Sequence, residues 1–281
     1  MPIPILCIAG PTASGKSRCA IEEALARGGE IISVDSRQVY RGLDIGTEKI
    51  SKEEMRNVPH RLIDICDVNE PYSAGDFVAD ATRLIDEITA RGNLPILVGG
   101  THFYFDALLH GLPEDTPPDQ WLRKELKRLA TEELYARVRQ ADPRRARELD
   151  PHNRRRLVRA LEIIAAHGSV PPRARSGGFV NPHMVEWIII EPSNEELRTR
   201  IDVRLESALA RGLIDEVCRV REEVGDARLN ELGLEYRVVG EYLRGERSEE
   251  SLLPALSAKL WQYARRQKAW LAKLARECKT S

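Results

Sequence analysis

Short apolar runs alternate with amphipathic stretches in the N-terminal part of the chain. Near-continuous apolar runs are typical of strands that are buried on both faces of a parallel sheet. Four such runs are strand candidates: residues 3–9, 31–34, 62–65 and 95–98. Between them, apolar residues at helical spacing predict helices over about 15–27 and 77–91. Strands that alternate with helices predict an α/β domain built on a parallel sheet.

The pattern changes from about residue 113. Residues 112–118 are rich in proline and acidic side chains and read as a linker, after which amphipathic helical stretches follow without a strand candidate. An apolar run at 187–190 restores the strand pattern, and leucines at helical spacing predict a long final helix. We therefore expect an all-helical domain, residues 113–180, inserted into an α/β core formed by residues 1–112 and 181–281.

The composition is that of a globular protein. Of 281 residues, 42% are hydrophobic and 31% charged, and no apolar run approaches the roughly 18 to 20 residues of a membrane span. The first apolar run is too short for a signal peptide and lacks a basic lead. The five cysteines have no Cys-x-x-Cys spacing, which favours reduced thiols over a zinc site or a disulfide framework. We expect a cytoplasmic protein that does not contact a membrane.

Charge is distributed unevenly along the chain. The net charge is −1, yet residues 121–176 carry 15 Lys and Arg against 7 Asp and Glu, and residues 261–281 carry 6 against 1. Basic blocks in an acidic body indicate contact with nucleic acid. The alternative is that basic helices present solvated faces, and for charge alone this plainer interpretation is favoured.

Residues 10–17 match the phosphate-loop pattern G-x-x-x-x-G-K-[ST], after the first predicted strand and at the start of a predicted helix. Gly10 and Gly15 let the backbone curl so that amide groups and the helix N-terminus converge on phosphate oxygens. Lys16 adds a positive charge, and the Ser17 hydroxyl is a ligand for Mg²⁺ bound to those oxygens. The motif predicts binding of a diphosphate group, of which a nucleoside triphosphate is only the commonest source.

Two further segments reach the carboxyl edge of the predicted sheet, where open α/β sheets bind ligands. Asp35 and Ser36 follow the second strand, and Gly99, Gly100 and Thr101 follow a later buried strand. A carboxylate at Asp35 can act as general base or assist Mg²⁺; the alternative is a helix cap or a salt-bridged loop residue. For Gly99 and Gly100 two interpretations are open: they contribute to the site, or they only form a turn. These residues fit a small-molecule kinase and a diphosphate-dependent transferase equally well.

Six separated segments resemble those of the tRNA dimethylallyltransferases, in the same order along the chain. They are residues 10–17, 33–40, 44–47, 59–64, 95–101 and 156–162. A joint match over nearly the whole chain is more specific than the phosphate loop alone. The resemblance implies a P-loop NTPase-like fold that transfers the dimethylallyl group of dimethylallyl diphosphate to N6 of the adenosine 3′ to a tRNA anticodon. The loop would then grip diphosphate instead of ATP.

The resemblance also implies roles for residues near the prenyl donor. Asp35 would act on the attacking amine, Thr101 would contact the substrate, and Arg204 would stabilise the diphosphate. The donor would be bound by the loop residues Gly10, Thr12, Ala13, Ser14, Gly15, Lys16 and Ser17, with Mg²⁺ at Ser17. Without the resemblance, an ion pair on its own helix, for instance with Asp202, is the plainer interpretation of Arg204.

The target adenosine must unstack from its neighbours to enter a closed pocket, where protein groups recognise the edges of the base. The residues that resemble tRNA-contacting positions of the family are Asp35, Ser36, Arg37, Gln38, Thr101, Arg123, Arg155, Arg156, Leu157, Val158, Arg159, Arg237, Arg266 and Gln267. Arg155 and Arg159 lie one helical turn apart and can follow the phosphates of the anticodon stem. Trp270 fits burial in a core. Glu235 replaces a glycine of the family, and we expect this change on the RNA-facing surface.

The implied partners are a tRNA anticodon stem-loop and dimethylallyl diphosphate, bound by a monomer. A prenyltransferase for free adenine nucleotides is one alternative, although it needs no basic insertion. A small-molecule kinase is a second. A phosphate-loop module that couples nucleotide state to a partner is a third and has no enzymatic activity of its own.

Overall fold

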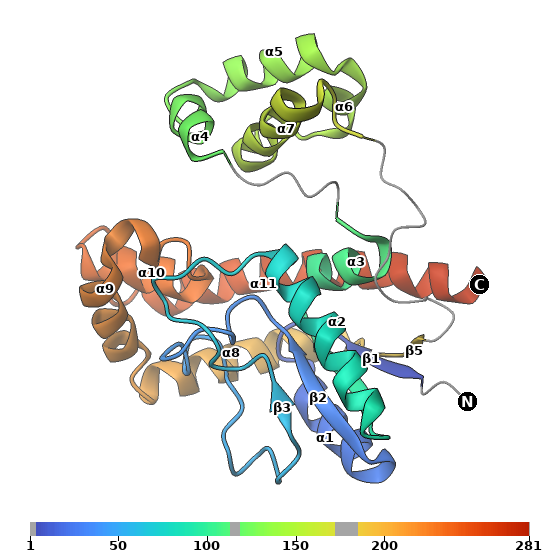
Figure 1. The fold of residues 1–281 in the computed structure, drawn as a ribbon. Helices are drawn as coiled ribbons and strands as arrows, with labels where there is room; N and C mark the ends of the chain where they lie inside the picture. Colours follow the sequence, from blue (N-terminus) through green and yellow to red (C-terminus); the bar gives the residue numbers. More distant parts are fainter. Residues whose placement is uncertain (1–3, 113–118, 172–184, 281) are drawn as a thin grey trace. The chain divides into compact units, whose positions relative to one another are not determined.

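The computed structural model describes residues 4–112, 119–171 and 185–280, with side chains up to Leu274 (Figure 1). The chain forms two compact units. The first combines Met1–Leu109 with Phe179–Ser281, and the second comprises His110–Gly178. The first unit therefore contains both the phosphate-loop segment and the basic C-terminal segment, which are far apart in the sequence.

The first unit is built on a five-stranded parallel sheet with strand order β3-β2-β4-β1-β5. The strands are β1 (Ile5–Ala9), β2 (Gly29–Val34), β3 (His60–Arg61), β4 (Leu94–Gly99) and β5 (Val185–Ile189). β1 and β4 are buried along their whole length, as expected for strands covered on both faces. The predicted fold class, a P-loop NTPase-like parallel sheet flanked by helices, is confirmed.

The third strand differs from the prediction. We expected a strand at residues 62–65, but β3 ends at Arg61. Leu62 and Asp64 have positive φ angles of 60° and 56°, which an extended strand does not allow. The apolar residues there therefore belong to a bend that follows the strand, although Leu62 itself is buried.

Helices cover the sheet on both faces. α1 (Lys16–Arg27) packs Ala20, Ile21 and Ala24 against apolar residues of β1, β2 and β4. α2 (Ala74–Ala90) begins at a capping box and packs against β4 and β2. The β1–β2 and β3–β4 connections run in opposite directions along the sheet, so right-handed crossovers place α1 and α2 on opposite faces (Figure 1).

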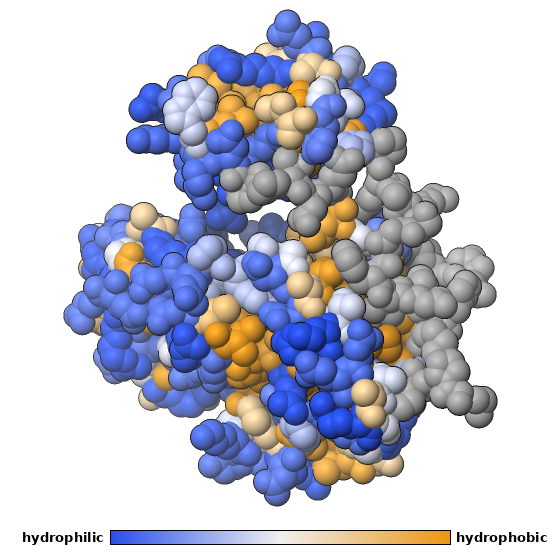
Figure 2. All heavy atoms as spheres, viewed as in Figure 1, coloured by the Kyte–Doolittle hydropathy of each residue, from blue (hydrophilic) through white to orange (hydrophobic). Residues whose placement is uncertain are grey.

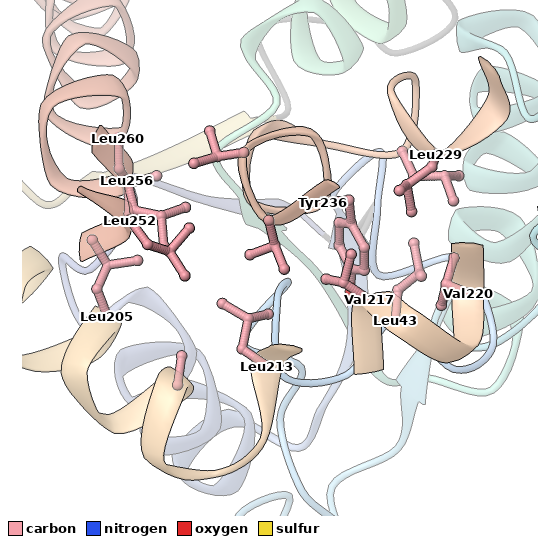
Figure 3. Packing of buried hydrophobic residues seen from close by; sticks show 14 of the residues in the cluster. Leu43, Leu205, Leu213, Val217, Val220, Leu229, Tyr236, Leu252, Leu256 and Leu260 are labelled. Atoms are coloured by element: carbon pink, nitrogen blue, oxygen red, sulfur yellow. The ribbon is translucent and has the colours of Figure 1, made fainter. Parts of the chain in front are cut away.

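Further helices complete this unit: α3 (His102–His110), α8 (Asn194–Ala210), α9 (Leu213–Leu229), α10 (Leu234–Leu243) and α11 (Leu252–Thr280). α8 to α11 share an apolar cluster around Tyr236, whose side chain is 1% exposed and lies close to Val217 and Leu43 (Figure 3). Leu252, Leu256 and Leu260 of α11 join the same cluster at helical spacing. The predicted long final helix is therefore present, and one of its faces is part of the core.

The second unit has a core of its own. Its described part consists of α4 (Gln120–Leu126), α5 (Thr131–Ala141), α6 (Pro143–Glu148) and α7 (Arg154–His167). The helices bury one apolar cluster that includes Leu126, Leu134, Val138, Leu157 and Leu161. Asp119, Asp142 and Asn153 cap three of the helix starts. Short helices of this kind depend on tertiary packing because isolated helices of such length are marginal in water.

Within the described ranges, every helix is too short or too polar to traverse a lipid bilayer. Figure 2 shows hydrophilic residues spread over the face in view of both units, with apolar residues in scattered patches.

Candidate active site

The phosphate loop joins β1 to α1 at the carboxyl edge of the sheet. Ala13 and Gly15 have positive φ angles of 60° and 90°, which alternate with ordinary conformations between them. Such alternation turns successive N–H groups toward one point and makes an anion-binding concavity. A Cβ atom at Gly10 would lie 2.6 Å from Ser14 Oγ, so a side chain there would disturb the curl. The backbone is thus shaped to hold an anion.

Several donors in the loop are free to bind an anion. Among the described residues, no side chain caps the start of α1, and the first N–H groups of a helix have no partner within it. The buried Ser14 Oγ also makes no hydrogen bond in the described part of the chain. Lys16 Nζ donates to the carbonyl oxygen of Pro11 at 2.7 Å, so it lies folded over the loop. These groups together fit a diphosphate.

The pKa of Lys16 depends on its burial and on two charged neighbours. Burial lowers the pKa of Lys16 to about 8, the neighbouring Asp35 carboxylate opposes this shift, and the Arg204 guanidinium adds to it. The three groups are therefore close enough to influence one another. An anion bound in the loop would favour the charged form of Lys16.

Side chains from two distant helices hold the loop. Gln267 of α11 accepts from Thr12 N at 2.9 Å and donates through Nε2 to the Gly100 carbonyl oxygen at 2.8 Å. On α8, Arg200 donates to the Ser14 carbonyl oxygen at 3.1 Å, and Arg204 donates to Thr12 Oγ1. The partners of Arg204 are thus not on its own helix, contrary to the plainer interpretation of this residue.

The carboxyl ends of the central strands are level. Ala9 of β1 and Val34 of β2 both pair with Gly99 of β4. The residues that follow, in the phosphate loop and at Asp35 and Gly100, therefore meet at one edge of the sheet. This register brings the predicted donor loop next to the predicted base.

Asp35 and Thr101 are positioned by local hydrogen bonds. Asp35 Oδ1 accepts from Arg37 N at 2.8 Å and from Gln38 N at 3.3 Å, which forms a turn closed by the side chain. Thr101 Oγ1 accepts from Ser36 N at 3.2 Å. Within the described residues, Asp35 Oδ2 makes no hydrogen bond. One carboxylate oxygen therefore holds the turn while the other is available to a substrate.

Gly100 has a packing role that the sequence left open. A Cβ atom at this position would collide with Gln267 Nε2. The glycine therefore lets the amide of Gln267 reach the end of β4. Gln267 itself is 3% exposed, and both ends of its amide are occupied inside this unit.

Glu216 is a buried residue of this region that sequence reasoning missed. Its carboxylate accepts from Asp44 N, Ile45 N and Gly46 N at 3.0, 2.7 and 2.9 Å, and from the Tyr236 hydroxyl at 2.6 Å. The loop thus anchored reaches Gln38, whose Nε2 donates to the carbonyl oxygens of residues 47 and 48 at 3.2 Å. Glu216 therefore stabilises the segment that holds the side chain of Gln38, three residues after Asp35. In the sequence, Glu216 looks like any acidic residue of an amphipathic helix, so no local pattern indicates its burial.

Glu235 does not lie where we expected it. Its carboxylate is 3.5 Å from Arg204, and the side chain is 13% exposed. Burial raises the pKa of Glu235, which the Arg204 guanidinium opposes. The residue therefore lies beside the phosphate loop and not on an exposed surface, because α10 turns this side chain toward α8.

The remaining predicted RNA contacts differ in exposure. In the first unit, Arg237 and Arg266 are exposed and Arg37 is half-buried. Trp270 packs against Phe105 with ring centroids 6.1 Å apart, in keeping with a core role.

In the second unit, Arg155 and Arg156 are exposed on α7, and Arg159 is half-buried. Leu157 and Val158 point into the core of this unit, with side chains 0% and 9% exposed. Their part in any RNA contact is to fix the helix that presents the arginines.

Arg123 and Arg159 both approach the buried carboxylate of Glu162, at 2.6 and 3.7 Å. This pairing ties α4 to α7. Arg123 therefore has a structural partner in addition to any contact with RNA.

In the described ranges, no group of three or more His, Cys, Asp or Glu side chains is arranged to hold a metal ion. Cys19, Cys66 and Cys218 are free thiols. Ser17 is exposed at the start of α1, and its hydroxyl and the Asp35 carboxylate are candidate oxygen ligands near the loop. Such a sparse oxygen set suits Mg²⁺ that takes its other ligands from a bound diphosphate and water.

The parallel sheet, the curled loop and the carboxylate at the same edge define a P-loop protein with a candidate phosphate site beside a candidate base. A family model described as IPP transferase matches residues 38–274. The chain belongs to this family.

Individual relatives match over almost the whole chain. A tRNA dimethylallyltransferase from Thermomicrobium roseum is 41% identical over 278 residues, which cover 96% of this chain and 84% of the relative. The full-length tRNA isopentenylpyrophosphate transferase from Bacillus halodurans, a crystal structure, is 36% identical with a TM-score of 0.70 over 96% of this chain and 86% of that one. A eukaryotic dimethylallyltransferase acting on tRNA is 27% identical with a TM-score of 0.81, over 95% and 69% of the two chains.

Proposed function

We propose that this protein transfers the dimethylallyl group of dimethylallyl diphosphate to N6 of the adenosine 3′ to the anticodon in tRNA. The observation that carries the proposal is the strand register, which sets the phosphate loop and Asp35 at one edge of the sheet. Relatives about 40% identical over most of the chain, named tRNA dimethylallyltransferases, support it.

The donor diphosphate would lie in the phosphate loop. Loop N–H groups, Ser14 Oγ, Lys16 and Arg204 would stabilise the negative charge that grows on the leaving oxygen as the allylic C–O bond breaks. Mg²⁺, held by Ser17 and diphosphate oxygens, would supply further positive charge at those oxygens. Thr12, Ala13, Gly10 and Gly15 would contribute the backbone of the cradle.

The acceptor is a weak nucleophile because the lone pair of its amine is delocalised into the adenine ring. The free Oδ2 of Asp35 would accept a hydrogen bond from N6 and take its proton as the N–C bond forms. Thr101, bonded to Ser36 N, would fix the loop that contacts the base. The products are the N6-prenylated adenosine, diphosphate and a proton on Asp35.

The tRNA would be held through its anticodon stem-loop by a monomer in the cytoplasm. Arg123, Arg155, Arg156 and Arg159 of the helical unit would contact backbone phosphates, and Arg37, Arg237 and Arg266 would contact the loop. A transferase for free adenine nucleotides has no use for the arginines of the helical unit, which favours tRNA.

Labelled dimethylallyl diphosphate separates the alternatives. The label should move to unmodified tRNA and not to AMP, and the reaction should neither need nor hydrolyse ATP. Transfer of a terminal phosphate from ATP to a small molecule would instead support a kinase. ATP binding without any transfer would support a nucleotide-dependent binding module.

Donor binding is expected to weaken as the pH rises through about 8, because Lys16 loses its proton there. Above this pH each further unit should weaken binding by up to about tenfold, and binding should be accompanied by proton uptake. Calorimetric titration with Mg²⁺ and inorganic diphosphate across the pH range measures both. Lys16→Arg keeps its charge and is the control; the same pH dependence in this variant would contradict the assignment.

Replacing Arg155 and Arg159 together by alanine is expected to weaken tRNA binding and to reduce its salt slope by roughly two, since two phosphate contacts are lost. The matched control is the double variant Arg128→Ala with Arg137→Ala. It removes the same charge from this unit, but each of these arginines is paired with a glutamate of the preceding turn. Binding isotherms at several salt concentrations give the slopes. Equal slopes in the two variants would place the RNA elsewhere.

A further inference from the structure

Glu235 is a largely buried carboxylate that the proposed reaction does not use. Its Oε1 atom lies 3.5 Å from Arg204 Nη2, and the two side chains are 13% and 15% exposed. The other terminal nitrogen of Arg204 donates to Thr12 Oγ1 in the phosphate loop. One guanidinium is therefore shared between the loop and a carboxylate.

Burial disfavours the negative charge of Glu235 and raises its pKa, and Arg204 is the main neighbouring group that favours the charge. The titratable or charged groups that face it are Arg204 of α8, Asp35 and Arg37 after β2, Tyr236 of α10 and Tyr263 of α11. Among the described residues, Arg204 is its only ion-pair partner. A carboxylate with a single cationic partner and little solvent is stable as an anion only while that partner remains close.

We propose that Glu235 is an internal counter-ion of Arg204 that competes with the diphosphate of the prenyl donor and product for this guanidinium. The inference rests on the proposed function, since it concerns the same anion site. In the free protein, Glu235 would hold Arg204 against Thr12. When diphosphate binds, Arg204 gains a second anionic partner, and the Glu235 carboxylate comes near a multiply charged ligand.

Two consequences follow from this competition. Diphosphate binds less tightly than the cradle alone would allow, which favours release of the product. The bound state also favours the protonated form of Glu235, because burial, Asp35 and the ligand all disfavour its negative charge. Glu235 acts through Arg204 and is thus a positioning residue.

Glu235→Gln tests the proposal, since glutamine keeps the size of the side chain and removes its charge. The affinity for inorganic diphosphate with Mg²⁺ should increase on the order of tenfold when one nearby negative charge is removed. Proton uptake on diphosphate binding is measured by calorimetry in buffers of different ionisation enthalpy, near neutral pH, where Lys16 is charged. Glu235→Gln should take up fewer protons than the wild type, because glutamine cannot be protonated in this way. Glu250→Gln, which removes an exposed carboxylate, is the matched control.

A double-mutant cycle checks that the effect passes through Arg204. In an Arg204→Ala background, Glu235→Gln should change the affinity for diphosphate much less than in the wild type. Glu235→Asp retains the charge with a shorter reach and should lie between wild type and glutamine, which provides a second variant should the first fail to fold.

If Glu235→Gln binds diphosphate no more tightly than the wild type, while the wild type transfers the prenyl group to tRNA, this inference is overturned and the proposed function stands. A wild-type protein that binds no diphosphate would instead overturn the proposed function. The two failures are therefore distinguishable.

Discussion

Replacing Asp35 by asparagine is expected to lower the turnover of tRNA prenylation by about 10²- to 10⁴-fold, the usual contribution of a general base. The amide oxygen of asparagine can still accept from Arg37 N and Gln38 N, so the turn should persist. What is lost is a basic atom at the position of Oδ2. Single-turnover rates with prebound donor and tRNA measure the chemical step directly.

The affinities for donor and tRNA should change little in this variant. Donor binding is best compared near neutral pH, because Asp35 also helps to keep Lys16 protonated. Asp86→Asn is the matched control, since it removes an exposed carboxylate from α2. A rate for Asp35→Asn equal to that of the control would remove the assigned role.

The parts of the site that were predictable from the sequence are those encoded locally. The phosphate loop depends on the spacing of Gly10, Gly15 and Lys16 within eight residues, and the positive φ angle of Gly15 fits that pattern. Asp35 was found because strands of a parallel sheet bring their carboxyl ends to one edge. The first inference needed a local motif that follows a strand, and the second needed a strand assignment and a rule about sheet topology.

Contacts made by distant helices were not predictable in the same way. The contact of Gln267 with Thr12 joins positions 255 residues apart, and that of Arg204 with Thr12 joins positions 192 apart. The resemblance named both residues, but assigned Gln267 to RNA. Which face of α8 or α11 meets the loop depends on the packing of the apolar cluster around Tyr236, and no local pattern records it.

Glu235 illustrates the same difficulty. The resemblance placed it on the RNA-facing surface, because it replaces a glycine in a segment that faces RNA in the family. Its burial follows from the rotation of α10, which is fixed by Tyr236 and Val239 in the core. The error at residues 62–65 has another cause, since apolar side chains in a bend can be buried as fully as those in a strand.

Glu216→Gln is expected to lower the free energy of unfolding by about 2 to 4 kcal/mol, since it disturbs a buried, fully used hydrogen-bond acceptor. The carboxylate accepts three backbone N–H groups and the Tyr236 hydroxyl. Glutamine places an NH₂ group, which is a donor, against one or more of these donors. At least one buried donor then loses its partner.

Urea unfolding followed by circular dichroism measures this loss, with Glu222→Gln as the control on an exposed face of the same helix. Tyr236→Phe removes only one of the four donors and should cost less, about 1 kcal/mol. Because the loop after Leu43 carries the carbonyl groups that hold Gln38, Glu216→Gln should also slow prenyl transfer below the unfolding transition. A variant as stable and as active as the control would mean that the loop is held by its own turn and not by the buried carboxylate.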